Sequence, residues 1–136
     1  MFNPGLKIGQ ELKNDEIIRL FRCGNMGGMR RSKATNTLVI IFDHTKKIYR
    51  DKWIDGVLHY TGMGKSGDQS IKYAQNATLA ESEHNGVTVH LFEVFEEGKY
   101  TYCGIVHLAG TPYTEIQPGE DGHERKVFIF PLIPEK

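Results

Sequence analysis

The chain has 136 residues, a formal net charge of zero at pH 7, and 39% hydrophobic against 25% charged residues. We predict a single soluble domain over residues 1–136, because this length buries one core and the composition excludes a disordered chain. No apolar run reaches the roughly 18 residues of a membrane span and the N-terminus does not resemble a signal peptide, so we expect a cytoplasmic protein without a membrane partner.

The first half of the chain predicts one short helix and two strands. Asn14 opens NDEIIRLF with an Asn cap, acidic residues in the first turn and helical apolar spacing, so we predict a helix that ends at residues 23–24. A glycine-rich basic loop follows, and the β-branched apolar run at residues 37–42 predicts a buried strand. Residues 56–61 predict a strand that leads into the glycine turn GMGKSG.

The second half predicts a longer helix and then hairpin strands. Residues 68–84 begin with an acid, are rich in alanine and end before Asn-Gly, which predicts the main helix. Residues 87–95 and 99–108 flank a Glu-Glu-Gly turn and predict an antiparallel hairpin. Residues 125–132 predict a last strand, placed at an edge or terminus by Pro131. Together these elements favour an α+β fold, a mostly antiparallel twisted sheet curled into a partial barrel with one or two helices.

Residues that commonly carry catalysis are not grouped in this sequence. Cys23 and Cys103 form no CxxC pair, which argues against a disulfide framework or a cysteine zinc site. The six histidines share no ligand spacing, and no serine or cysteine stands in a nucleophile-elbow motif. We therefore expect no metal, no cofactor and no catalytic residue.

The glycine turn at residues 62–67 matches the GxGxxG pattern of dinucleotide-binding loops. The hairpin pattern that follows does not supply the alternating strand-helix units of that fold, so a small enzyme with a nucleotide cofactor is kept as an alternative. A looser prediction is that the amides of this turn cradle one phosphate, with Lys65 nearby.

Aromatic and acidic side chains gather just before this turn. They are Tyr49, Asp51, Trp53, Asp55, Tyr60 and Thr61. Two rings can hold a planar ligand at about 1–3 kcal/mol per stack, and a carboxylate can accept a hydrogen bond from an amino group such as N4 of cytosine. The residue types alone leave open whether these groups bind a ligand or are core rings and surface acids. They also leave open which acid, Asp51 or Asp55, and which second ring, Tyr49 or Trp53, complete the set.

The stretch HYTGMGKSGDQSIKYAQNATLAES resembles the signature of the SRA (SET and RING-associated, or YDG) domain family. The matching residues, in order, are Tyr60, Thr61, Gly62, Gly64, Asp68, Gln69, Asn76, Leu79 and Ala80. GMRRS at residues 28–32, a Tyr-x-Asp before a glycine, and the terminal VFIFPL also match in order, so the resemblance covers about residues 6–132.

This resemblance implies a module that flips 5-methylcytosine or 5-hydroxymethylcytosine out of double-stranded DNA into an aromatic pocket. By motif, Tyr60 and Tyr49 would be the stacking rings, Asp51 would accept from N4, and Thr61 would form a wall near the C5 substituent.

The same resemblance implies DNA contacts from two glycine-bearing segments. The residues concerned are Gly28, Met29, Arg30, Arg31, Ser32, Gly62, Gly64, Lys65 and Gln69. Met26 or Met29 would insert as a wedge into the vacated base stack.

The short segment between the YTG motif and the Asp-Gln pair resembles the compact bacterial members of the family. These are usually fused to nucleases, often of the HNH type, in modification-dependent restriction. The implied protein is a bacterial, cytoplasmic reader of modified cytosine whose nuclease is fused or supplied by a partner, because this chain contains no nuclease motif. The alternative binder is another PUA-like domain that recognises RNA or a modified nucleotide.

Overall fold

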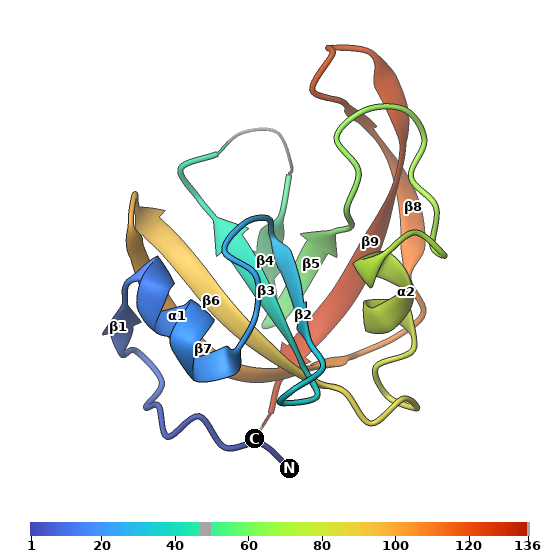
Figure 1. Cartoon of the computed structure of the whole chain (residues 1–136). Coiled ribbons are helices and arrows are strands. Elements are labelled where there is room, and N and C mark those ends of the chain that lie inside the picture. The colour runs from blue at the N-terminus through green and yellow to red at the C-terminus, as the bar shows by residue number, and fades with distance from the viewer. Residues whose placement is uncertain (47–49, 136) are drawn as a thin grey trace.

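The computed structural model of the protein describes residues 1–46 and 50–135 and shows a curled sheet with two short helices (Figure 1). The strands are β1 (Glu11–Leu12), β2 (Met29–Ser32), β3 (Thr37–Asp43), β4 (Lys52–Ile54), β5 (Val57–Thr61), β6 (Thr88–Glu96), β7 (Lys99–Leu108), β8 (Tyr113–Pro118) and β9 (Glu124–Pro134). The helices are α1 (Asn14–Phe21) and α2 (Gln75–Ala80).

The sheet is mixed and open. Across the described residues its order is β2-β3-β6-β7-β9-β5-β4, with β1 paired to β7 and β8 paired to β9. The pair β3 and β6 is parallel, and the other described pairs are antiparallel. The strands curl around a common interior without closing into a barrel (Figure 1). The predicted α+β class with a partially curled, mostly antiparallel sheet is confirmed.

Strand β3 is buried on both faces, which explains its unbroken apolar run. Leu38, Ile40 and Phe42 point into the larger core cluster, together with side chains of β5, β6, β9 and α2. Val39 and Ile41 point the other way, into a smaller cluster under α1. Helix α1 contributes a single apolar stripe to that smaller cluster, as its helical spacing predicts.

The predicted helix over residues 68–84 is wrong in its extent. The regular helix, α2, occupies only Gln75–Ala80. The preceding residues are bound to strand β9 instead. The Gln69 amide donates to the Lys126 carbonyl at 2.8 Å, and the Asp68 carboxylate accepts from the Lys126 amide at 2.8 Å. These tertiary hydrogen bonds hold the chain extended and override its helical composition.

Three other predicted features change in the structure. Helix α1 ends at Phe21, where Arg22 adopts a left-handed conformation with φ 56°. Strand β9 is central rather than at an edge, since it pairs with β5, β7 and β8. Strand β8 forms where the sequence analysis predicts no strand. No described helix is long and apolar enough to cross a membrane.

Candidate functional site

Asp51 lies just before the β4–β5 hairpin, and its side chain is partly buried. Its Oδ1 accepts a hydrogen bond from the Thr61 backbone amide at 2.7 Å. The Thr61 side chain also interacts favourably with this carboxylate. Burial raises the pKa of Asp51 to about 6, against the opposing effects of the Thr61 hydrogen bond and of the nearby His44. The group is therefore a partly desolvated hydrogen-bond acceptor.

Tyr60 and Thr61, at the end of β5, lie beside this carboxylate. The Thr61 hydroxyl oxygen is buried and has no hydrogen-bond partner within the described part of the chain. The Tyr60 ring is also buried, and its hydroxyl lies 2.8 Å from the Gly28 carbonyl oxygen and 3.0 Å from that of Ile41. A Cβ at Gly28 would lie 3.0 Å from the same hydroxyl, so glycine allows this close approach.

His44 lies near Asp51 and belongs to a cluster of side chains that the sequence analysis missed. Its ring stacks between Phe42, at a centroid distance of 3.9 Å, and Phe95, at 4.4 Å. Its Nε2 lies 2.7 Å from a carboxylate oxygen of the buried Glu93. Strands β3 and β6 are parallel neighbours, and this pairing brings residues 44, 93 and 95 together. Only the strand register, which sequence patterns do not give, reveals this cluster.

The remaining pocket candidates lie elsewhere or outside the described residues. Tyr49 lies outside the described residues. Trp53 pairs with Leu58 and packs against the larger core cluster. Asp55 is exposed in the β4–β5 turn with φ 50°, at the end of the hairpin away from Thr61. The structure thus brings together Asp51, Tyr60 and Thr61 and separates Asp55 from them.

The predicted contact residues of the first glycine-rich segment are largely structural. Met29 is buried at 5% exposure in the core, which corrects the prediction that its side chain reaches DNA as a wedge. Arg30 is buried as well and donates to the Gly27 carbonyl and to the Asn14 side chain. Met26 is 79% exposed in the same loop.

The next two predicted contact residues, Arg31 and Ser32, form hydrogen bonds within the β2–β3 turn. Arg31 donates to the Asn36 side chain at 3.0 Å and to the Thr37 carbonyl at 3.2 Å. Ser32 is buried at 1% exposure and its hydroxyl accepts from the Thr35 amide. Both side chains therefore stabilise the β2–β3 connection.

The second glycine-rich segment is fastened to β9. The Gln69 side chain is buried, donates to the Gly62 carbonyl at 2.7 Å and accepts from the Phe128 amide at 2.9 Å. A Cβ at Gly62 would lie 2.7 Å from the Asn76 side-chain oxygen, so this position requires glycine. Lys65 is exposed, with its ammonium 3.8 Å from the Glu120 carboxylate.

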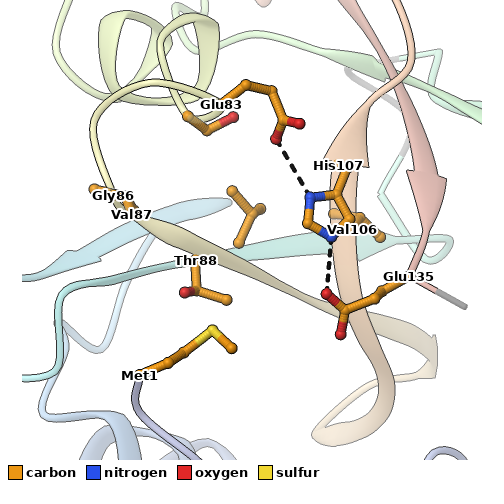
Figure 2. Close-up of a pocket in the computed structure, with 10 residues that line it drawn as sticks. Met1, Glu83, Gly86, Val87, Thr88, Val106, His107 and Glu135 are labelled. Atoms are coloured by element: carbon orange, nitrogen blue, oxygen red, sulfur yellow. Dashed lines mark hydrogen bonds and ion pairs between the residues drawn. The ribbon is translucent and has the colours of Figure 1, made fainter.

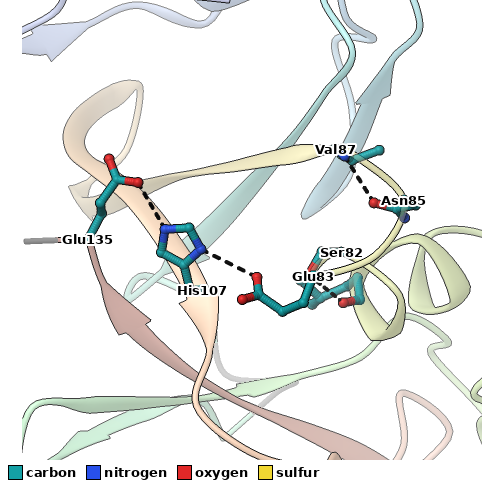
Figure 3. A network of polar contacts seen from close by, with 7 residues as sticks. Ser82, Glu83, Asn85, Val87, His107 and Glu135 are labelled. Atoms are coloured by element: carbon teal, nitrogen blue, oxygen red, sulfur yellow. Dashed lines mark hydrogen bonds and ion pairs between the residues drawn. The ribbon is translucent and has the colours of Figure 1, made fainter. Parts of the chain in front are cut away.

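A cavity of about 270 Å³ lies apart from these residues, between the α2–β6 connection and the end of β9 (Figure 2). His107 bridges two carboxylates there, with Nδ1 3.3 Å from Glu83 and Nε2 3.0 Å from Glu135 (Figure 3). The hydrogen bond to Glu135 raises the pKa of His107, against partial burial and with a further contribution from Glu83. These contacts connect three segments, and we assign them to stability.

The fold is that of the SRA and PUA-like domains. The model of the ScoMcrA-like SRA domain matches residues 8–135, and the chain therefore belongs to this family. This confirms the resemblance drawn from the YTG motif. SRA domains are DNA-binding modules without catalytic activity of their own.

Solved structures show the same fold. The type IV phosphorothioation-dependent restriction endonuclease ScoMcrA is 25% identical with a TM-score of 0.77, over 95% of this chain and 24% of that one. The sulfur-binding and SRA domains of ScoMcrA, complexed with phosphorothioated DNA, are 23% identical with a TM-score of 0.77, over 95% and 40%. The SUVH5 SRA domain in complex with hemimethylated CG DNA is 23% identical with a TM-score of 0.70, over 98% and 92%. No curated protein matches the chain.

The chain spans less than half of the two ScoMcrA chains but nearly the whole SUVH5 domain. Two of these neighbours are complexed with modified DNA, phosphorothioated in the ScoMcrA fragment and hemimethylated in the SUVH5 domain.

Proposed function

We propose that this domain recognises DNA carrying 5-methylcytosine or 5-hydroxymethylcytosine, by accepting the flipped base beside Asp51, Tyr60 and Thr61. The observation that carries the proposal is the partly buried Asp51 carboxylate beside Tyr60 and Thr61, with one oxygen held by the Thr61 amide. The Watson–Crick edge of cytosine offers an amino group at N4 to such an acceptor.

The energies support this assignment. Flipping a base costs a few kcal/mol. Stacking on an aromatic ring contributes about 1–3 kcal/mol, and a hydrogen bond to a charged group contributes about 1.5–3 kcal/mol. One ring and one carboxylate therefore offset much of the free-energy cost of flipping, and stacking on a second ring offsets the remainder.

Residue roles follow from where each side chain lies. Tyr60 stacks on one face of the base, and its hydroxyl bonds keep the ring fixed. We assign the second ring to Tyr49 by its place in the motif. Met26, exposed beside Gly27 and Gly28, is the side chain that enters the vacated base stack.

The biological role that we propose is the specificity domain of a modification-dependent restriction system in the bacterial cytoplasm. ScoMcrA is a restriction endonuclease of which an SRA domain forms one part. In the same way, cleavage by the present system would come from a fused or partner nuclease, such as one of the HNH type.

Competition binding tests the proposal directly. Duplexes that differ only at one C5 position, carrying cytosine, 5-methylcytosine or 5-hydroxymethylcytosine, compete for the domain at several salt concentrations. We expect a modified duplex to bind at least tenfold more tightly than the unmodified one. Equal affinities for all three duplexes at every salt concentration would refute the proposal.

A further inference from the structure

Glu93 in strand β6 is a buried carboxylate whose partner is a histidine. Its side chain has one oxygen 2.7 Å from His44 Nε2, and the other accepts a hydrogen bond from the Cys103 thiol at 3.4 Å. Burial and this carboxylate raise the pKa of Cys103 to about 12, so Cys103 stays a neutral donor. Burying a carboxylate without a positive partner is costly. Since His44 is the only basic side chain that pairs with Glu93 among the described residues, the pair favours a positively charged ring at His44.

The His44 ring is held in one orientation. It stacks between Phe42 and Phe95 with interplanar angles of 24° and 19°. Its backbone amide donates to the Val94 carbonyl at 2.8 Å, which extends the pairing of β3 with β6. The faces of aromatic rings attract cations, so this stack suits a protonated imidazole. The charge at His44 is therefore fixed in place by the two strands.

The fixed ring lies at the same end of the sheet as the proposed base pocket. The Tyr60 hydroxyl lies 3.0 Å from the Ile41 carbonyl oxygen, and this contact joins the end of β3 to the end of β5. Thr61 follows, and its amide donates to Asp51 at 2.7 Å. The charge of His44 reaches this carboxylate, where it lowers the pKa of Asp51 against the larger effect of burial.

The other charged groups of the neighbouring segments have their own partners or lie in solvent. The Asp43 carboxylate accepts from the amide and the hydroxyl of Thr45, at 2.9 and 2.6 Å. Lys46 is exposed. Glu96, at the end of β6, pairs with Lys99 at 3.1 Å. Within the described residues, the His44 ring therefore has two carboxylates to act on, the one that holds it and the one in the pocket.

We infer that His44 is a positioning residue of the base pocket: held by Glu93 and by its ring stack, its positive charge keeps Asp51 ionised. The inference rests on the proposed function, in which Asp51 accepts the N4 amino group of the flipped base. An ionised carboxylate accepts hydrogen bonds on both oxygens, whereas a protonated one presents a donor on one of them. Recognition of modified cytosine should therefore depend on pH near neutrality, with His44 setting where the dependence falls.

Three substitutions separate the charge of His44 from its packing. The His44 side chain is 33% exposed, so a replacement can extend towards solvent. His44→Gln removes the charge and keeps a donor for Glu93. His44→Arg keeps a positive charge and a planar group that stacks on aromatic faces. His84→Gln is the matched control, because His84 is exposed in the α2–β6 connection, before the opposite end of β6 (Figure 1).

Titration of the free protein measures the effect on Asp51 without DNA. The carboxyl carbon of Asp51, followed by NMR in 13C-labelled protein, should titrate near pH 6 in the parent. His44→Gln should raise this midpoint by about one pH unit, because an opposite charge nearby lowers a carboxyl pKa by about that much or more. His44→Arg should leave the midpoint at or below that of the parent, and His84→Gln should not change it. Equal midpoints in His44→Gln and the parent would overturn the inference. If circular dichroism shows that His44→Gln does not fold, His44→Arg decides, since a midpoint above that of the parent would then overturn it.

Duplex competition at two pH values tests the consequence for recognition. A midpoint that moves from about 6 to about 7 lowers the ionised fraction of Asp51 at pH 6.5 from about three quarters to about one quarter. His44→Gln should therefore lose about threefold of the preference for the modified duplex at pH 6.5. At pH 8.5, where Asp51 is ionised in both proteins, the preference should equal that of the parent. An unchanged preference at pH 6.5, or an equal loss at both pH values, would overturn the positioning role.

The two experiments distinguish failure of this inference from failure of the proposed function. If the parent prefers modified DNA but His44→Gln leaves the Asp51 midpoint unchanged, the base pocket stands and the role of His44 is wrong. If the parent shows no preference at any pH, the proposed function is refuted and the role of His44 in recognition is refuted with it. A raised midpoint in that case would still establish the charge coupling between His44 and Asp51, because the titration involves no DNA.

Discussion

Replacing Asp51 with asparagine should stabilise the free protein. The pKa of Asp51 is raised to about 6 from 3.8, a difference that corresponds to about 3 kcal/mol. The folded protein binds a proton at Asp51 more tightly than the unfolded chain does. Protonated Asp51 is therefore fully tolerated in the folded state below pH 4, and the free energy of unfolding falls as the pH rises through 6. Asparagine still offers an oxygen to the Thr61 amide but carries no charge. We therefore expect Asp51→Asn to be up to about 3 kcal/mol more stable than the parent at pH 7.5, with the advantage disappearing towards pH 4.

The same substitution should weaken recognition of modified cytosine. Hydrogen bonds to charged groups contribute about 1.5–3 kcal/mol, so losing the ionised acceptor should cost about 10–150-fold in affinity for the modified duplex. Urea unfolding at pH 4, 6 and 7.5 measures the first effect, and duplex competition at pH 7.5 measures the second. Higher stability combined with weaker DNA binding in the Asp51→Asn variant would show that the carboxylate serves ligand binding at a cost to stability.

Asp55→Asn is the matched control, since it makes the same chemical change in an exposed turn at φ 50°, a conformation that asparagine tolerates. It should change neither stability nor affinity appreciably. The reasoning is refuted if Asp51→Asn is no more stable than the parent at pH 7.5, or if it keeps the full preference for the modified duplex.

The other predictions concern Thr61, Tyr60 and the more distant His107. Thr61→Val removes a buried hydroxyl that makes no hydrogen bond of ordinary geometry within the described residues, so urea unfolding should show a stability change below about 1 kcal/mol. Competition should show weaker binding of modified DNA. A larger loss of stability would contradict this. Tyr60→Phe keeps the ring but loses the hydroxyl bonds, and should lower the unfolding free energy by about 1 kcal/mol with selectivity retained. His107→Ala should destabilise the protein below about pH 6.5 and approach the parent as the pH rises through the raised pKa of His107, with DNA binding unchanged; equal destabilisation at pH 5.5 and 8.5 would argue against the ion-pair role.

The sequence predicts the strands well where one physical signal dominates. The apolar run that becomes β3 is buried on both faces, and the hairpin signal between residues 87 and 108 becomes β6 and β7. Helix α2 shows the limit of local signals. The composition of residues 68–84 favours a long helix. Instead, the side chain and the backbone amide of Gln69 form hydrogen bonds with β9, which lies more than 50 residues away in sequence.

Some residues of the candidate site are likewise predictable from local sequence, and others are not. The YTG motif predicts Tyr60 and Thr61, while the choice between the two acids depends on hairpin geometry. Asp55 precedes Gly56, and this Asp-Gly pair is a turn signal that places Asp55 at the tip and leaves Asp51 beside Thr61. Arg125 gives no such signal, because a charged residue at the start of a strand is ordinarily exposed, and only the tertiary structure shows it beneath the glycine turn.

Strand β5 connects the three parts of the proposed interface. The Tyr60 hydroxyl holds the Gly28 loop, the Thr61 amide holds Asp51, and Gly62 begins the turn above Arg125. A flipped base has a fixed separation between its ring face and its amino group, so a reader that engages both must hold its ring and its acceptor at a fixed spacing. Consecutive residues of one strand, hydrogen-bonded to β9 on one side, supply that spacing without further ordering on binding. The cost of flipping the base is then offset by contacts whose geometry exists before DNA arrives.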